Sequence, residues 1–98
     1  MKEFKMKELE LYYFPACPFC KKVLKFINRN NLDEQVVLRN IHEDPDAKRE
    51  LKVIGGKEQV PCLFINKQPL YESNDIIKWF EENMFSYLNT NTNIDENK

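Results

Sequence analysis

The chain has 98 residues, the size of a single domain that can bury a small core without disulfide staples. Its 15 Lys and Arg residues nearly balance its 16 Asp and Glu residues, which argues against nucleic acid as the main partner. Segment 1–10 lacks the apolar stretch of a signal peptide, and no later segment is apolar enough to span a bilayer. We therefore expect a cytoplasmic protein with no membrane partner, in which three cysteines indicate redox or metal chemistry rather than a disulfide framework.

The first half of the chain predicts a strand, a helix and a second strand. Apolar residues alternate over 9–13, which is typical of a strand. Residues 18–31 have a helical period, with apolar residues at i, i+3, i+4 and i+7: Cys20, Val23, Leu24 and Ile27. The β-branched run 35–41 predicts the second strand, so the three elements form a βαβ unit with parallel strands.

The second half predicts a helix, a hairpin and a last helix. Asp44-Pro45-Asp46 is a helix start, followed by an apolar stripe of Ala47, Leu51 and Ile54 that ends at Gly55-Gly56. Segments 61–65 and 69–71 flank a polar turn at 66–68, which reads as a β-hairpin. Ser73 is predicted to cap a third helix whose buried side carries Ile76, Ile77, Phe80 and Met84. The order βαβαββα defines a domain over 1–88, and the polar segment 89–98 is predicted to be disordered.

Two cysteines lie where the first strand passes into the first helix, in Cys17-Pro18-Phe19-Cys20. Pro18 suits the first helical position, which makes Cys17 the N-cap. The free amides of Phe19 and Cys20 and the positive end of the helix dipole then favour a thiolate at Cys17. The spacing also allows a Cys17–Cys20 disulfide, since the flexible first turn can bring the two Cβ atoms close enough.

A structural zinc site is the rival interpretation of this pair. Such a site needs four ligands, and Cys62 and His42 are the only further Cys or His residues. We therefore predict redox chemistry and no metal. Cys62 is either a small buried apolar residue or a third thiol able to accept a disulfide by exchange. His42 is interpreted as a loop residue and Trp79 as partial cover of the core.

Three motifs together resemble the glutaredoxin family: Cys17-Pro18-Phe19-Cys20, Gln59-Val60-Pro61 and Glu72-Ser73-Asn74-Asp75. Their order and spacing match over roughly residues 8–84. The resemblance implies a thioredoxin-like α/β fold with a four-stranded mixed sheet flanked by three helices, a cis Val60–Pro61 bond, and glutathione as co-substrate. It also implies Cys17 and Cys20 as catalytic residues and a glutathione site formed by Phe19, Lys21, Gln59, Val60, Pro61, Glu72 and Ser73.

The chain departs from the common glutaredoxin pattern on the glutathione side. Many members have a basic residue three positions before the first cysteine, where this chain has Phe14, and the nearest replacements are Lys21 and Lys57. Glu72-Ser73 stands where many have Gly-Gly and is similar to the γ-glutamyl-binding turn of glutathione transferases. Ser73 at a helix start would hold the α-carboxylate of the γ-glutamyl group, and a nearby acid its ammonium.

This sequence predicts a monomeric glutathione-dependent thiol–disulfide oxidoreductase that reduces protein disulfides and glutathionyl mixed disulfides. One alternative is an iron–sulfur cluster carrier, in which Cys17 of two protomers and two glutathione thiols hold the cluster. Another is a single-domain protein that binds glutathione as glutathione transferases do.

Overall fold

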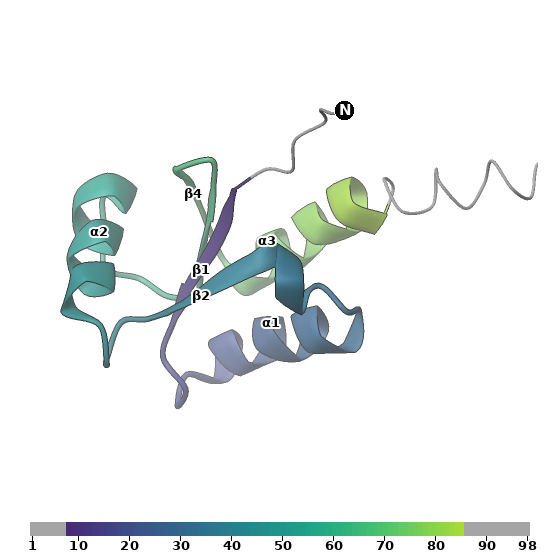
Figure 1. Ribbon diagram of the computed structural model, residues 1–98, viewed down its shortest axis with the longest axis horizontal. Coiled ribbons are helices and arrows are strands. Elements are labelled where there is room, and N and C mark those ends of the chain that lie inside the picture. The colour runs from purple at the N-terminus through teal and green to yellow at the C-terminus, as the bar shows by residue number, and fades with distance from the viewer. Residues whose placement is uncertain (1–7, 86–98) are drawn as a thin grey trace, which may run out of the picture.

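The computed structural model describes residues 8–85, which form one four-stranded sheet with helices packed on its faces (Figure 1). Its strands are β1 (Leu9–Tyr13), β2 (Val36–Asn40), β3 (Cys62–Ile65) and β4 (Gln68–Tyr71). They lie in the order β2-β1-β3-β4, with β1 parallel to β2 and antiparallel to β3, and β3 antiparallel to β4. This mixed sheet and its three helices confirm the predicted α/β thioredoxin-like fold and the element order.

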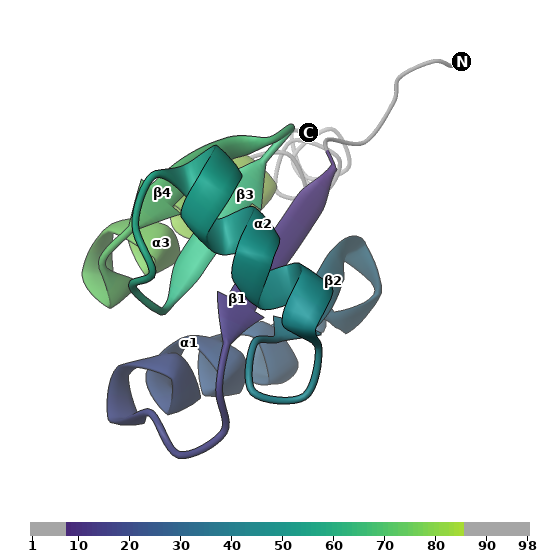
Figure 2. The same cartoon turned by 90° about the vertical axis from the view of Figure 1, so that its left-hand side faces the viewer.

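The helices divide unequally between the two faces of the sheet. Helix α2 (Pro45–Gly55) covers one face, while α1 (Pro18–Arg29) and α3 (Ser73–Phe80) cover the other (Figures 1 and 2). Strand β1 is central and has both faces covered, so Leu9 and Leu11 are buried on one side and Tyr12 on the other. No helix among residues 8–85 is long and apolar enough to cross a bilayer.

Two apolar clusters fill the two spaces beside the sheet. The cluster under α1 and α3 is the larger and includes Leu11, Val23, Ile27, Ile76 and Phe80, with Trp79 half-buried against it as predicted. The cluster under α2 comprises Tyr12, Ile41, Ala47, Leu51, Cys62 and Phe64.

Several predicted boundaries were wrong by a few residues. Helix α1 ends at Arg29 rather than at 31, and a 3-10 turn, η1 (Asp33–Gln35), precedes β2. The hairpin turn has two residues, not three, because Asn66 and Lys67 both adopt positive φ (51° and 71°), as a tight turn between twisted strands requires. Ile54, predicted in the buried stripe of α2, is 43% exposed, because the residue of the last turn that faces the sheet is Gly55, where an added Cβ would lie 3.4 Å from the Phe64 ring.

The third helix differs most from its prediction. Ser73 is not its cap: Glu72 occupies the N-cap position with φ 76°, and Ser73 is the first helical residue. After Phe80 the chain continues as a π-helical turn, η2 (Glu81–Phe85). The predicted burial of the Met84 side chain and the predicted disorder of 89–98 lie outside what the structure describes.

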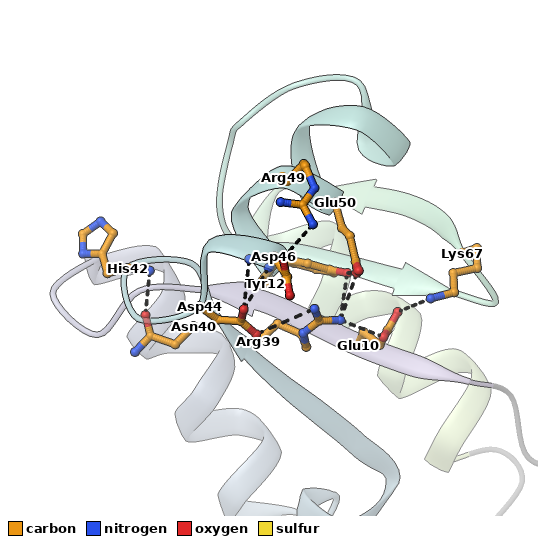
Figure 3. Close-up of polar contacts among 11 residues, drawn as sticks. Glu10, Tyr12, Arg39, Asn40, His42, Asp44, Asp46, Arg49, Glu50 and Lys67 are labelled. Atoms are coloured by element: carbon orange, nitrogen blue, oxygen red, sulfur yellow. Dashed lines mark hydrogen bonds and ion pairs between the residues drawn. The ribbon is translucent and has the colours of Figure 1, made fainter.

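The α2 face also contains a polar network centred on Arg39 of β2 (Figure 3). Its guanidinium donates to Glu10 Oε2 at 3.1 Å and to the Tyr12 hydroxyl at 3.4 Å, and it pairs with Glu50 Oε1 at 3.1 Å. Lys67 of the hairpin turn pairs with the other oxygen of Glu10 at 3.3 Å. The network therefore joins β1, β2, α2 and the β3–β4 turn, with Arg39 and Glu10 largely buried and Glu50 and Lys67 more exposed to water.

Candidate functional site

Cys17 is the N-cap of α1, as predicted from the sequence. Its backbone is extended (φ −74°, ψ 120°), Pro18 takes the first helical position, and the Cys20 amide donates to Cys17 Sγ at 3.2 Å. We expected the Phe19 amide to contribute as well; the donor in the structure is the Cys20 amide. An N–H directed at the sulfur stabilises the thiolate, which is the nucleophilic form.

The two thiols differ in how far water reaches them. Cys17 is 7% exposed and Cys20 is fully buried, and both are free cysteines. Burial first, and then the hydrogen bond with Cys17, raise the pKa of Cys20 to about 12 from an ordinary value of 9.0. Cys20 therefore remains a protonated thiol at neutral pH, and Cys17 is the member of the pair suited to attack a disulfide from solvent.

A pocket of about 460 Å³ opens beside this helix start. Three segments that are distant in sequence form its wall: the first turn of α1, the segment before β3, and the start of α3. The Val60–Pro61 bond in the second of these segments is cis, as the glutaredoxin resemblance implied. The lining residues are Phe19, Gln59, Val60, Pro61, Glu72, Ser73, Asn74 and Asp75.

Six of the seven residues predicted to bind glutathione lie in this wall, and Lys21 does not. Lys21 is exposed on α1, where its amide donates to the Cys17 carbonyl at 2.9 Å. Lys57, the other basic residue considered, lies with its Nζ 4.8 Å from the centre of the Tyr71 ring and is also absent from the lining. Phe19 is 63% exposed, which agrees with the exposure predicted from its place in the motif.

The α3 end of the pocket carries its polar groups. Glu72 accepts a hydrogen bond from Gln59 Nε2 at 3.2 Å, and Ser73 beside it is buried. Lys22 of α1 donates to Asn74 Oδ1, which ties the two helices together at the pocket rim. Sequence reasoning did not assign Asn74 and Asp75 to the site, although both follow Glu72-Ser73 directly and could have been found from that motif.

The family model described as Glutaredoxin matches residues 9–70, more than half of the chain. The chain belongs to the glutaredoxin family. A probable glutaredoxin of Synechocystis is 29% identical over 70 residues, covering 70% of this chain and 77% of the relative. Glutaredoxin 1 of Rickettsia prowazekii is 24% identical over 79 residues, covering 80% and 82%. The wheat glutaredoxin structure matches with a TM-score of 0.59 at 22% identity, covering 86% of this chain and 80% of that one, and so supports the fold.

The family and fold support a thiol–disulfide oxidoreductase, and the Cys17–Cys20 pair of this glutaredoxin fits the C-x-x-C motif of such proteins. Among residues 8–85, no group of three or more His, Cys, Asp and Glu side chains is placed to hold a metal ion.

Cys62 lies outside this pair. Although it follows the cis proline directly, its side chain is fully buried in the cluster under α2, with Tyr12 and Phe64. Burial raises the pKa of the Cys62 thiol to about 11. Both observations favour the structural interpretation of this residue over an exchange partner for Cys17.

His42 is exposed in the loop after β2, as predicted, but its ring contact was not foreseen. The imidazole stacks on Phe14, with ring centres 4.2 Å apart and planes 6° from parallel. The Phe14 carbonyl in turn accepts from the Cys17 amide at 3.2 Å. Phe14 therefore supports the turn that presents Cys17.

Proposed function

We propose that this glutaredoxin is a glutathione-dependent oxidoreductase that reduces glutathionyl mixed disulfides and protein disulfides and acts as a monomer. The observation that carries the proposal is the N-capping Cys17 beside a pocket walled by the cis Val60–Pro61 bond and the start of α3. A pocket next to the nucleophile can hold the thiol partner in position for sulfur–sulfur exchange.

In the monothiol route, the Cys17 thiolate attacks the glutathionyl sulfur of a mixed disulfide. A Cys17–glutathione disulfide forms and the target protein leaves as a thiolate. The thiolate of a second glutathione then attacks the glutathionyl sulfur on Cys17, which releases oxidised glutathione and restores Cys17.

In the dithiol route, Cys17 attacks a protein disulfide and Cys20 resolves the mixed disulfide. The products are the reduced target and a Cys17–Cys20 disulfide, which two glutathiones return to two thiols as oxidised glutathione forms. The protonated state of Cys20 in the resting protein fits this order, because Cys20 acts only after Cys17 has become part of a disulfide.

Glutathione binding is proposed to use the pocket wall. The backbone of Val60, before the cis proline, would pair with the cysteinyl part of glutathione, and Phe19 would pack against it. The first amides of α3 and the Ser73 hydroxyl would hold the α-carboxylate of the γ-glutamyl group, and Glu72 its ammonium. A reducing compartment such as the cytoplasm would supply the glutathione.

The test is the reduction of a glutathionylated peptide, followed with and without added glutathione, by wild type, Cys17→Ser and Cys20→Ser. We expect Cys17→Ser to be inactive and Cys20→Ser to keep deglutathionylation, with mass spectrometry locating the glutathione adduct on Cys17. Turnover that requires a thioredoxin reductase instead of glutathione would refute the glutathione dependence. An adduct mainly on Cys20 would refute the assignment of the nucleophile.

A further inference from the structure

The exposed side of helix α1 carries only positive charge. Its charged residues are Lys21, Lys22, Lys25 and Arg29, all exposed, and the helix contains no Asp or Glu. Lys21, Lys25 and Arg29 follow one another at intervals of four residues, so they form a row along the helix surface, which we call the basic row. The whole chain has a net charge of −1, so the basic row is a local concentration of positive charge.

No ion pair within residues 8–85 neutralises the basic row. The ion pairs of that part of the chain all join residues outside α1. Lys22, beside the row, donates to the neutral side-chain amide of Asn74. Asp33, in the turn that follows the helix, accepts from Asn28 at 3.4 Å. The three cations of the row are therefore available to a partner.

The stability of α1 does not explain the basic row. Like charges four residues apart repel each other on the surface of a helix, so the row by itself destabilises α1. Helix α2 shows how such repulsion is avoided, since its cations alternate with carboxylates and Arg49 pairs with Asp46. An anionic partner bound along α1 would remove the repulsion in the same way.

The basic row begins beside the nucleophile. Cys17 is the N-cap of α1, and the amide of Lys21 donates to the Cys17 carbonyl at 2.9 Å. With a rise of about 1.5 Å per residue, the three cations lie about 6, 12 and 18 Å from Cys17 along the helix axis. An extended peptide advances about 3.3 Å per residue, so it would pass these cations roughly two, four and six residues from the cysteine that Cys17 attacks.

We propose that the basic row is a docking surface for an extended acidic segment next to the disulfide of a protein substrate. Asp and Glu residues of that segment pair with Lys21, Lys25 and Arg29 while its cysteine meets Cys17. The partner is a polypeptide because the adjoining thiol pair acts on disulfides, which nucleic acids lack. This inference rests on the proposed function in one respect, that Cys17 attacks protein disulfides.

Three peptides with one cysteine each, prepared as symmetric disulfide dimers, provide the test. The residues two, four and six positions to either side of the cysteine are all glutamate, all glutamine or all lysine, and the other residues are alanine and serine. The pre-reduced protein supplies both electrons. Cys17 attacks one sulfur and releases one peptide thiol, Cys20 then releases the second, and the protein is left with a Cys17–Cys20 disulfide.

The rate of protein oxidation by each peptide is divided by the rate of the same peptide with dithiothreitol, which removes differences in intrinsic reactivity. In wild type we expect the normalised rate to be highest for the glutamate peptide and lowest for the lysine peptide. The double variant Lys25→Gln/Arg29→Gln should lower the ratio of the glutamate rate to the glutamine rate about threefold or more, as expected for the loss of two exposed ion pairs. Lys25→Glu/Arg29→Glu should make the lysine peptide the faster one. The preference in wild type should also weaken as salt is added.

The double variant Lys48→Gln/Lys52→Gln is the matched control, because it removes two exposed cations from α2 on the opposite face of the sheet (Figure 2). We expect it to keep the wild-type ratio within about 1.5-fold, since exposed charges farther apart than a Debye length, about 10 Å, are largely screened. Each ratio compares two peptides on one protein, so a loss of stability affects both rates alike. Lys25→Gln alone, with a loss of about twofold, keeps the test open if the double variant does not fold.

Equal normalised rates for the three peptides in wild type would overturn the proposal, as would an equal loss in the α2 control variant. An equal preference for peptides whose glutamates all lie ten or more residues from the cysteine would also overturn it, because the row ends about 18 Å from Cys17. The assay contains no glutathione, so the charge preference without glutathione turnover would support the docking surface and refute only the glutathione dependence. Absence of oxidation by all three peptides would overturn the inference together with the redox role of the pair.

Discussion

Replacing Arg39 by methionine should destabilise the fold, because it removes the centre of the network on the α2 face. Arg39 is 17% exposed and Glu10 12%, so their 3.1 Å contact is an ion pair largely enclosed by the protein. Removing one member of a buried pair costs about 3–5 kcal/mol, because the other charge stays buried. In the Arg39→Met variant Glu10 keeps its ion pair with Lys67, and Glu50 is 36% exposed and therefore reached by water. Neither carboxylate is left wholly unpaired and buried, so we expect the free energy of unfolding to fall by a smaller amount, about 2–3 kcal/mol.

Urea unfolding followed by the fluorescence of Trp79, the single tryptophan, measures this loss. Arg49→Met is the control: Arg49 pairs with Asp46 at 2.6 Å, but both side chains are about two-thirds exposed. That variant should lose less than about 0.5 kcal/mol. A double-mutant cycle with Glu10→Gln then isolates the pair. If Arg39→Met is no more destabilising than Arg49→Met, the network contributes nothing to stability and this reasoning is wrong.

Three further changes test other parts of the structure. Gly55→Ala should destabilise the protein, since the new Cβ would lie 2.6 Å from the Tyr71 hydroxyl. In a Tyr71→Phe background, which lacks that hydroxyl, the same substitution should stabilise the protein by up to about 1 kcal/mol. Thermal melts of the four proteins measure both effects, and a change of stability in the same direction in both backgrounds would contradict the clash. The free energy of unfolding should fall as pH rises from about 9 to 11, because the Cys62 thiol ionises at lower pH in the unfolded chain than in the folded one. Urea unfolding over this pH range measures the fall, and a Cys62→Ala variant whose free energy of unfolding falls as steeply as that of wild type would contradict this reasoning. Ser73→Ala should lower the rate of glutathione-dependent turnover with little change in melting temperature, since Ser73 is not the helix cap. An equal loss of rate with a disulfide substrate that lacks the γ-glutamyl group would show that Ser73 does not bind that group.

The sequence predicted the nucleophile end of the site better than the ligand end, for a physical reason. The geometry of Cys17 depends on local rules alone: a proline at the first helical position and a side chain that can accept from the amide three residues on. The capping of α3 depends on Glu72 at φ 76°, a conformation that no local preference of glutamate favours. Ser73 was the better cap by residue type, and the path of the chain out of β4 overrode that preference.

Other differences required knowledge of how the elements pack. The period of α2 placed Ile54 with Ala47 and Leu51, but the last turn presents Gly55 to the sheet instead, and Ile54 is left exposed beside it. Lys21 was chosen by its closeness to Cys17 in sequence, and the turn of α1 carries it away from the pocket. The cis state of Val60–Pro61 was permitted by the proline and implied by the family resemblance, but not determined by the residues.

Strand β3 gives the protein a way to avoid disulfide shuffling. Successive strand residues point to opposite faces, so Leu63 joins the cluster under α1 and α3, while Cys62 joins the cluster under α2. The sheet therefore stands as a partition between the third thiol and the α1 side, where Cys20 is buried. Exchange requires one sulfur to approach another in line, and the fully buried Cys62 is closed to such an approach while the fold persists. Repeated oxidation and reduction should thus return the same Cys17–Cys20 bridge each time, and mispaired species involving Cys62 should arise only from chains that have unfolded.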